Sequence, residues 1–130
     1  MSPPCSPFRQ RWPWIGPDLQ TLRDTLRPPR LGPDRGEPLM VPVGKGERLL
    51  VLCDPPLGTG PGGLVVLVHG LGGSAGGGGL RRLGLCLQPA GFDVWRLNLR
   101  GAGAGRSLAA GTYAAACNPD LLPVLAAARR

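Results

Sequence analysis

A short segment in the middle of the chain combines the residue types that acyl-transfer chemistry uses. The apolar run Leu64–Val68 leads into His69-Gly70-Leu71, and a glycine-rich stretch follows. A backbone N–H in such a loop can donate a hydrogen bond to a developing oxyanion, and the Leu71 amide is the candidate donor. An isolated histidine at a strand end is more typical of a structural role. We therefore expect the ring of His69 to bond to the backbone of this loop.

The string Gly72-Gly73-Ser74-Ala75-Gly76 matches the G-x-S-x-G pattern of a serine nucleophile. That chemistry requires a serine on a tight turn that joins a strand directly to a helix, together with a general base. Here the strand ends near Val68 and the next helix begins near Leu80, so Ser74 lies in mid-loop. His69, the one histidine of the chain, precedes it. Ser74 is a candidate nucleophile by pattern, but we expect a loop serine that bonds to local backbone.

The same segment, from Gly70 to Ala75, also matches G-x-G-x-x-A directly after a strand. This pattern is typical of a loop that places a dinucleotide pyrophosphate at a helix N-terminus. It requires an acidic residue about 20 positions further on, at the end of the next strand. That strand ends in Asn98 instead. A dinucleotide-binding Rossmann-like fragment is therefore kept as an alternative, and we expect no cofactor.

The cysteines give no sign of a metal site, because they are widely spaced, form no C-x-x-C pair and accompany a single histidine. This usage predicts free thiols in a reducing, cytoplasmic setting. No apolar run approaches the roughly 18 residues that a transmembrane segment needs. The cysteines are Cys5, Cys53, Cys86 and Cys117.

The chain is basic, with a formal net charge of +7, and Lys45 is its only lysine. Arginine pairs with phosphates and carboxylates, so a small protein that binds nucleic acid or an anionic surface is a second alternative. Trp12 and Trp14 would then be stacking residues. No block of like charges occurs, and the 22 glycines and 16 prolines indicate a biased composition. We expect no specific nucleic-acid partner.

The surrounding sequence predicts the elements that must position the loop. Residues 37–54 are typical of a β-hairpin, and strands then alternate with helices, which indicates an α/β fold of doubly wound parallel strand–helix units. The unbroken apolar run of the first of these strands is typical of burial on both faces. The glycine-rich loops 69–79 and 100–111 fall at the carboxyl edge of the sheet, where such folds bind ligands. The expected segments are strands 64–68 and 92–99 and helices 80–87 and 121–130.

Composition divides the chain into an arm, residues 1–36, and a partial α/β domain, residues 37–130. The arm is rich in proline, arginine and tryptophan and contains a short helix, Gly16–Leu26, which Pro28-Pro29 should end. Three positions fit helix ends: Pro17 at a first helical position, Gly91 as a left-handed cap and Asp120 as an N-cap.

Three segments, taken in order, resemble the α/β-hydrolase superfamily and, more narrowly, its YheT-like branch of predicted hydrolases. They are Pro7-Phe8-Arg9 through Trp12 and Trp14 to Gly16–Leu22, then His69–Ser74, then Asn98–Gly101 before a glycine-rich loop. The resemblance covers essentially the whole chain but only about the first half of the family's domain. It implies the N-terminal half of an α/β-hydrolase fold, with an incomplete sheet.

This resemblance implies hydrolysis of carboxylic esters or related acyl bonds by a Ser–His–acid triad without a cofactor. The nucleophile elbow of such proteins follows the helix at which this chain ends, so none of the triad residues is present. Only the oxyanion-loop position carries over, onto Leu71 with Gly70 and His69 beside it. We expect a truncated hydrolase for a small acyl or ester substrate, inactive by itself, whose open sheet edge can self-associate.

Overall fold

The computed structural model describes residues 6–28 and 30–129. The chain divides into two compact units, Met1–Arg30 and Leu31–Arg130. Three expectations lie outside the described residues: the free thiol of Cys5, the helix end at Pro29 and the last helical residue at Arg130.

The first unit holds the helix α1 (Pro17–Leu26), which confirms the helix predicted there. Pro17 occupies the first turn, where the missing N–H of proline costs nothing. Gly16 precedes it with a φ of 86°, a conformation that favours glycine. None of the helix residues is buried. Arg27 lies over the ring of Trp14, its guanidinium carbon 5.8 Å from the ring centre.

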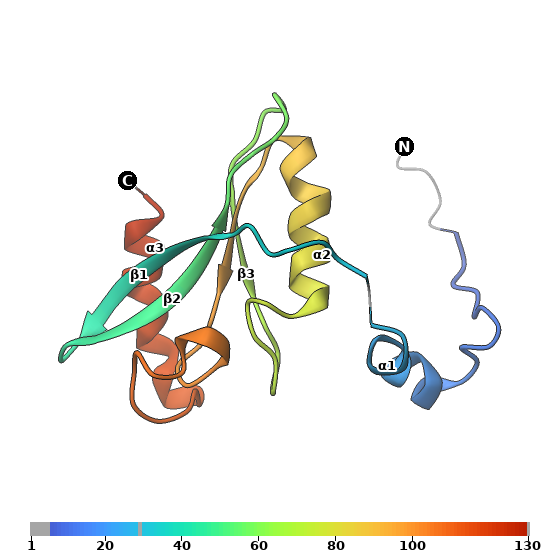
Figure 1. Ribbon diagram of the computed structural model, residues 1–130, viewed down its shortest axis with the longest axis horizontal. Coiled ribbons are helices and arrows are strands. Elements are labelled where there is room, and N and C mark those ends of the chain that lie inside the picture. Colours follow the sequence, from blue (N-terminus) through green and yellow to red (C-terminus); the bar gives the residue numbers. More distant parts are fainter. Residues whose placement is uncertain (1–5, 29, 130) are drawn as a thin grey trace. The chain divides into compact units, whose positions relative to one another are not determined.

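The second unit is built on a four-stranded mixed sheet with the order β1-β2-β4-β3. The predicted hairpin is confirmed, because β1 and β2 pair antiparallel around a tight turn at Lys45. β4 pairs antiparallel with β2 and parallel with β3. Insertion of β4 between β2 and β3 brings segments together that are distant in sequence (Figure 1). The strands are β1 (Glu37–Gly44), β2 (Glu47–Asp54), β3 (Leu64–Val68) and β4 (Asp93–Leu97).

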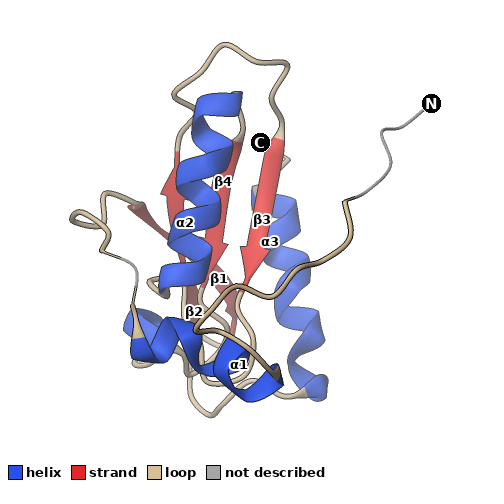
Figure 2. Cartoon of the chain, turned by 90° about the vertical axis from the view of Figure 1, so that its right-hand side faces the viewer, coloured by secondary structure: helices blue, strands red, loops and turns tan. Residues whose placement is uncertain are grey.

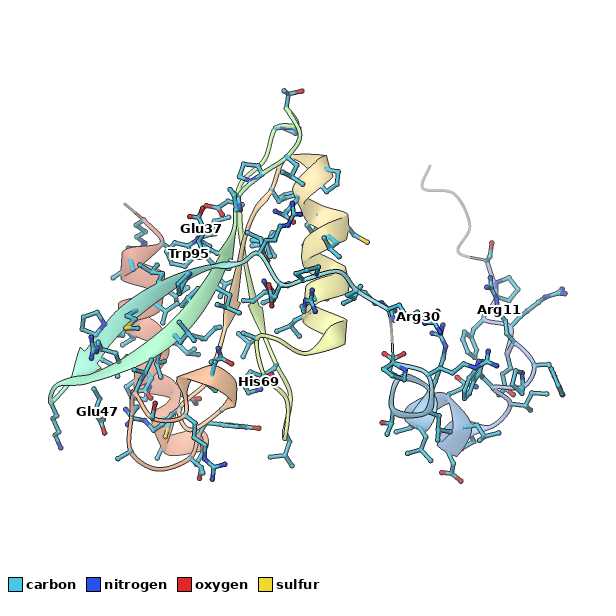
Figure 3. All side chains as sticks on the ribbon, viewed as in Figure 1. Arg11, Arg30, Glu37, Glu47, His69 and Trp95 are labelled. Carbon is cyan, nitrogen blue, oxygen red and sulfur yellow. The ribbon has the colours of Figure 1, made fainter. Side chains whose placement is uncertain are left out.

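Helices lie on both faces of this sheet, as a doubly wound arrangement requires. Figure 1 shows α3 on one side of the strands and α2 on the other. The main apolar core lies on the α3 side and contains Leu97 and Val124, both at most 1% exposed. Figure 3 places Trp95 on this same side of the sheet. The helical segments are α2 (Gly78–Leu87), α3 (Leu121–Ala127), and the short 3-10 helices η1 (Gln88–Ala90), η2 (Gly103–Gly105) and η3 (Ala115–Asp120).

β3 is less buried than its apolar sequence predicts. Its first four residues are half-buried and Val68 is 48% exposed. The reason is topological: β3 pairs with β4 on one side, and none of the described residues pairs with its other side. Figure 2 shows β3 at the edge of the sheet. The sheet is therefore incomplete, as expected, but the run does not form a central strand.

Two expected helix ends have different outcomes. Gly91 follows η1 in the left-handed conformation, with a φ of 88°, as predicted. Asp120 precedes α3, but its side chain makes no capping bond. Its carboxylate instead accepts hydrogen bonds from Nε and Nη2 of Arg100, at 2.9 and 3.1 Å. A bidentate bond from a guanidinium is stronger than a bond from a neutral backbone N–H, so Asp120 pairs with Arg100 and does not cap α3.

In the part of the chain that the structure describes, the helices are too short or too polar to traverse a bilayer.

Candidate functional site

The two predicted glycine-rich loops meet at one edge of the sheet. β3 and β4 run parallel, so the loop that follows Val68 and the loop that follows Leu97 leave the sheet on the same side. Figure 3 shows His69 at this edge, where the first loop begins. Hydrogen bonds between the two loops then fix the backbone of residues 69–76, and these residues are called the 69–76 loop below.

Both ring nitrogens of His69 are engaged: Nε2 reaches the second loop, and Nδ1 binds the backbone of the first. The Leu99 N–H donates to Nε2 at 3.1 Å, so Nε2 is the acceptor and Nδ1 carries the proton. Nδ1 then donates to the carbonyl oxygen of Gly70 at 2.9 Å. The ring is 5% exposed and has no nitrogen left for proton transfer. This is the structural role expected for His69.

Tyr113 is one of the residues of this site that the sequence did not reveal. Its hydroxyl accepts a hydrogen bond from the Gly72 N–H at 2.9 Å and donates one to the Gly70 carbonyl at 3.2 Å. Its ring packs edge-to-face on His69, with centres 5.5 Å apart and an interplanar angle of 81°. Tyr113 lies 41 positions after Gly72 and 43 after Gly70, and no motif connects them.

The two ends of the loop that follows β4 are joined to each other, and this closure places Tyr113 beside the 69–76 loop. The Tyr113 N–H donates to the Arg100 carbonyl at 2.9 Å. Gly101 adopts a φ of 72°, and a Cβ there would stand 2.3 Å from the Gly111 carbonyl oxygen. Glycine is therefore required at this position, and the glycine-rich composition of residues 100–111 was the only sequence signal of the closure.

β4 anchors the other end of the 69–76 loop at Ala75, which is fully buried. The Ala75 N–H donates to Oδ1 of Asn98 at 2.9 Å, and its carbonyl accepts from Nη1 of Arg96 at 2.9 Å. Arg96 and Asn98 are two positions apart, so they project from the same face of the strand. Sequence reasoning placed both residues in or beside β4 but assigned no role to either.

Arg96 is buried, 2% exposed, and is held by two carboxylates. It donates to Asp54 from Nε at 2.6 Å and from Nη2 at 2.9 Å, and to Asp34 from Nη1 at 2.9 Å and from Nη2 at 2.7 Å. Burial alone would lower the pKa of Arg96, but these hydrogen bonds outweigh it and raise the pKa. The hydrogen bond from Arg96 in turn lowers the pKa of Asp34 from 3.8 to about 2.

Arg100 makes a second ionic cluster at the base of the loop that follows β4. Besides Asp120, it donates from Nη1 to Oε2 of Glu47 at 2.6 Å. Figure 3 shows Glu47 near the hairpin turn. The hydrogen bond from Arg100, and then the one from the Ala110 N–H, lower the pKa of Glu47. Arg100 thereby ties the hairpin and the start of α3 to this loop.

Asn98 occupies the position where a ribose-binding carboxylate would stand in a dinucleotide site. It is 1% exposed, and its Oδ1 is engaged by Ala75 while Nδ2 has no partner among the described residues. Gly103 packs so closely that a Cβ there would lie 2.5 Å from Asn98 Oδ1. Asn98 therefore holds the loop rather than facing an open binding crevice.

Leu71 lies between the residues that Tyr113 binds. Its N–H donates to no group among the described residues, and its side chain is 96% exposed. A pocket of about 370 Å³ adjoins it. The pocket is lined by Leu71, Leu99, Tyr113, Ala114, Cys117, Asn118 and Leu121. A free backbone donor beside a mostly apolar pocket suits a ligand with one hydrogen-bond acceptor and an apolar body.

Ser74 lies in mid-loop, between β3 and α2. Its hydroxyl makes no hydrogen bond to any described residue, including the local backbone that we expected it to bind. Both nitrogens of His69 are engaged elsewhere, so the described residues contain no paired serine and base. Within the described ranges, no three His, Cys, Asp or Glu side chains gather as a metal site would require.

Two solved structures are similar to this chain. One is an α/β serine hydrolase without a lid from Xanthomonas campestris, with 25% identity and a TM-score of 0.58, covering 78% of this chain and 47% of that chain. The other is an α/β serine hydrolase homologue from Coxiella burnetii, with 22% identity and a TM-score of 0.52, covering 76% and 46%. No protein-family model and no curated protein matches the sequence.

The likeness confirms the fold class predicted from the sequence. The chain has a partial α/β-hydrolase fold and spans about half the length of the solved hydrolases that it matches.

Proposed function

We propose that the 69–76 loop is the oxyanion loop of an α/β-hydrolase of the YheT-like branch, and that the chain is the N-terminal half of this fold. The substrate class is carboxylic esters or related acyl bonds. The Leu71 N–H is the hydrogen-bond donor to the oxygen that becomes negatively charged. One observation carries the proposal: this N–H is free among the described residues, while the Gly70 carbonyl before it and the Gly72 N–H after it are both engaged.

A backbone donor of this kind acts without reorganisation, because the loop is held before the substrate arrives. His69, Tyr113 and the Arg96–Ala75–Asn98 bonds supply that rigidity. Loss of one oxyanion donor typically lowers kcat about 10²- to 10³-fold. The apolar pocket beside Leu71 would receive the acyl or alcohol part of a small ester.

The triad does not belong to the described residues. We propose that the nucleophile, the acid and the catalytic histidine come from the second half of the fold, which would pair with the open edge of β3. The 130 residues by themselves then bind an anionic acyl group but do not turn over an ester. In a p-nitrophenyl butyrate assay we expect no hydrolysis above background. Turnover that Ser74→Ala abolishes would contradict the inactivity of this half.

The oxyanion-donor role is tested with butyrate, whose carboxylate mimics the charged oxygen and whose chain fits an apolar pocket. The probe is a titration followed by ¹⁵N–¹H NMR of the whole chain. We expect the Leu71 amide to shift most, with a dissociation constant in the range of roughly 1–50 mM for so small a ligand. Leu71→Pro should abolish binding because it removes the N–H. Leu71→Ala is the matched control and should preserve it.

Uniform small shifts over all amides, or binding that survives Leu71→Pro, would refute the proposed donor.

A further inference from the structure

We infer that Tyr113 is a positioning residue that sets the direction of the Leu71 N–H. The inference rests on the proposed oxyanion role of Leu71. Its basis is the hydroxyl of Tyr113, which holds the residues on both sides of Leu71. It accepts from the Gly72 N–H at 2.9 Å and donates to the Gly70 carbonyl at 3.2 Å.

The geometry of the peptide group turns this contact into control of the donor. The Gly70 carbonyl and the Leu71 N–H belong to one planar trans peptide group, so they point in opposite directions. Whatever fixes the carbonyl therefore fixes the N–H. The Gly70 oxygen accepts from three donors: Tyr113, Nδ1 of His69 at 2.9 Å and the Gly73 N–H at 3.0 Å. These bonds draw the carbonyl toward the loop interior and aim the N–H away from it.

A glycine-rich loop needs such a restraint. Space around Gly70 and Gly72 is open, since a Cβ at either position would meet nothing within 4 Å. Packing therefore does not prevent rotation of the Gly70–Leu71 peptide group. In the rotated state the carbonyl oxygen would replace the N–H, and it would repel an anion. Of the three donors, only Tyr113 also holds the next amide, that of Gly72, which closes the restraint around Leu71.

The ring of Tyr113 has a separate role from its hydroxyl. The ring packs edge-to-face on His69, and the Tyr113 N–H is bonded to the Arg100 carbonyl. Both contacts are available to phenylalanine. Tyr113→Phe therefore removes the two hydroxyl bonds and leaves the packing of the loops in place, so it isolates the positioning role.

The experiment applies the butyrate titration to the Tyr113→Phe variant of the full chain. We expect butyrate to bind at least about fivefold more weakly, which corresponds to about 1 kcal/mol at 1.4 kcal/mol per tenfold change. We also expect the Gly72 amide to exchange with solvent at least about fivefold faster, because its acceptor is gone. The urea midpoint should change little. Ser107→Ala, which removes an exposed hydroxyl from the same loop, is the control and should change none of these.

The outcomes separate this inference from the proposed function. If butyrate does not bind the unchanged chain, the proposed function fails, and faster Gly72 exchange in Tyr113→Phe still supports the hydroxyl contact. If butyrate binds the unchanged chain and the Tyr113→Phe variant equally well, the positioning role of Tyr113 is overturned and the oxyanion role of Leu71 stands.

Discussion

Arg96 is the side chain whose loss should reach furthest, because it connects the sheet, the segment before β1 and the 69–76 loop. It donates to Asp54, to Asp34 and to the Ala75 carbonyl. Arg96→Met keeps an unbranched apolar side chain but removes every donor. We predict that this variant destabilises the second unit and releases the loop at Ala75.

The magnitude follows from burial. Arg96 is 2% exposed and the side chain of Asp54 is 11% exposed, so the variant leaves the Asp54 charge unpaired in a mostly buried site. Removal of one partner of a buried ion pair costs about 3–5 kcal/mol. Asp34 adds little, because its side chain is 32% exposed and regains water. We expect a loss of about 3–4 kcal/mol, a large part of the roughly 5–15 kcal/mol of a typical domain.

Urea denaturation of the whole chain, followed by circular dichroism and tryptophan fluorescence, measures this loss. The double variant Arg96→Met/Asp54→Asn removes the unpaired charge at nearly constant volume, and it should regain about 1–2 kcal/mol. Arg106→Met is the matched control. Arg106 is exposed and joins no ion pair among the described residues, so its replacement should change stability by less than about 0.5 kcal/mol.

A loss of less than about 1 kcal/mol in the free energy of unfolding for Arg96→Met would refute the reasoning, because a buried and unpaired Asp54 should destabilise the fold by more than that. The same holds if the double variant is no more stable than the single one. If Arg96→Met is unfolded without urea, the comparison of the double variant with Arg106→Met still decides the point.

Two further predictions concern titration and reactivity. The Arg96 hydrogen bond lowers the pKa of Asp34 from 3.8 to about 2. The stability that ionised Asp34 gives to the folded chain is therefore complete above pH 3.8 and is lost as the pH falls toward 2. The loss should be about 1 kcal/mol after allowance for solvent screening, and acid titration of unfolding should show it for the unchanged chain but not for Asp34→Asn. Burial, and then the charges of Asp93, Asp54 and Glu37, raise the pKa of the Cys53 thiol to about 11. At pH 8 roughly one such thiol in a thousand is ionised, so iodoacetamide should modify the exposed Cys86 well before Cys53. Peptide mass spectrometry measures the two rates. Equal rates would contradict the burial of Cys53.

Local sequence predicted the elements because each carries its signal within a few residues. Pro17 starts α1, Gly91 ends the helical segment after α2, and the apolar runs of the hairpin and of residues 64–68 form strands. The alternation of strands and helices also predicted that β3 and β4 are parallel. The two glycine-rich loops were therefore expected to meet at one edge of the sheet. The exception at Asp120 has a long-range cause, since Arg100 is 20 residues away.

Side-chain partners over long separations could not be predicted in this way. Arg96 binds Asp34 across 62 residues and Asp54 across 42, and neither pair has a local pattern. The order β1-β2-β4-β3 decides that β3 is an edge strand, although its sequence alone is typical of a buried one.

The sequence by itself determined that a glycine-rich loop follows a strand and that Leu71 follows His69-Gly70 within it. It could not determine which way the Leu71 N–H points, because glycines leave the peptide group free to rotate. The His69 ring and the Gly73 N–H are local partners of the Gly70 carbonyl oxygen. The tertiary structure decided the direction, because Leu99 holds that ring in place and Tyr113 reaches the same oxygen from 43 positions away. A planar peptide group with its oxygen held in this way has a single direction left for its N–H.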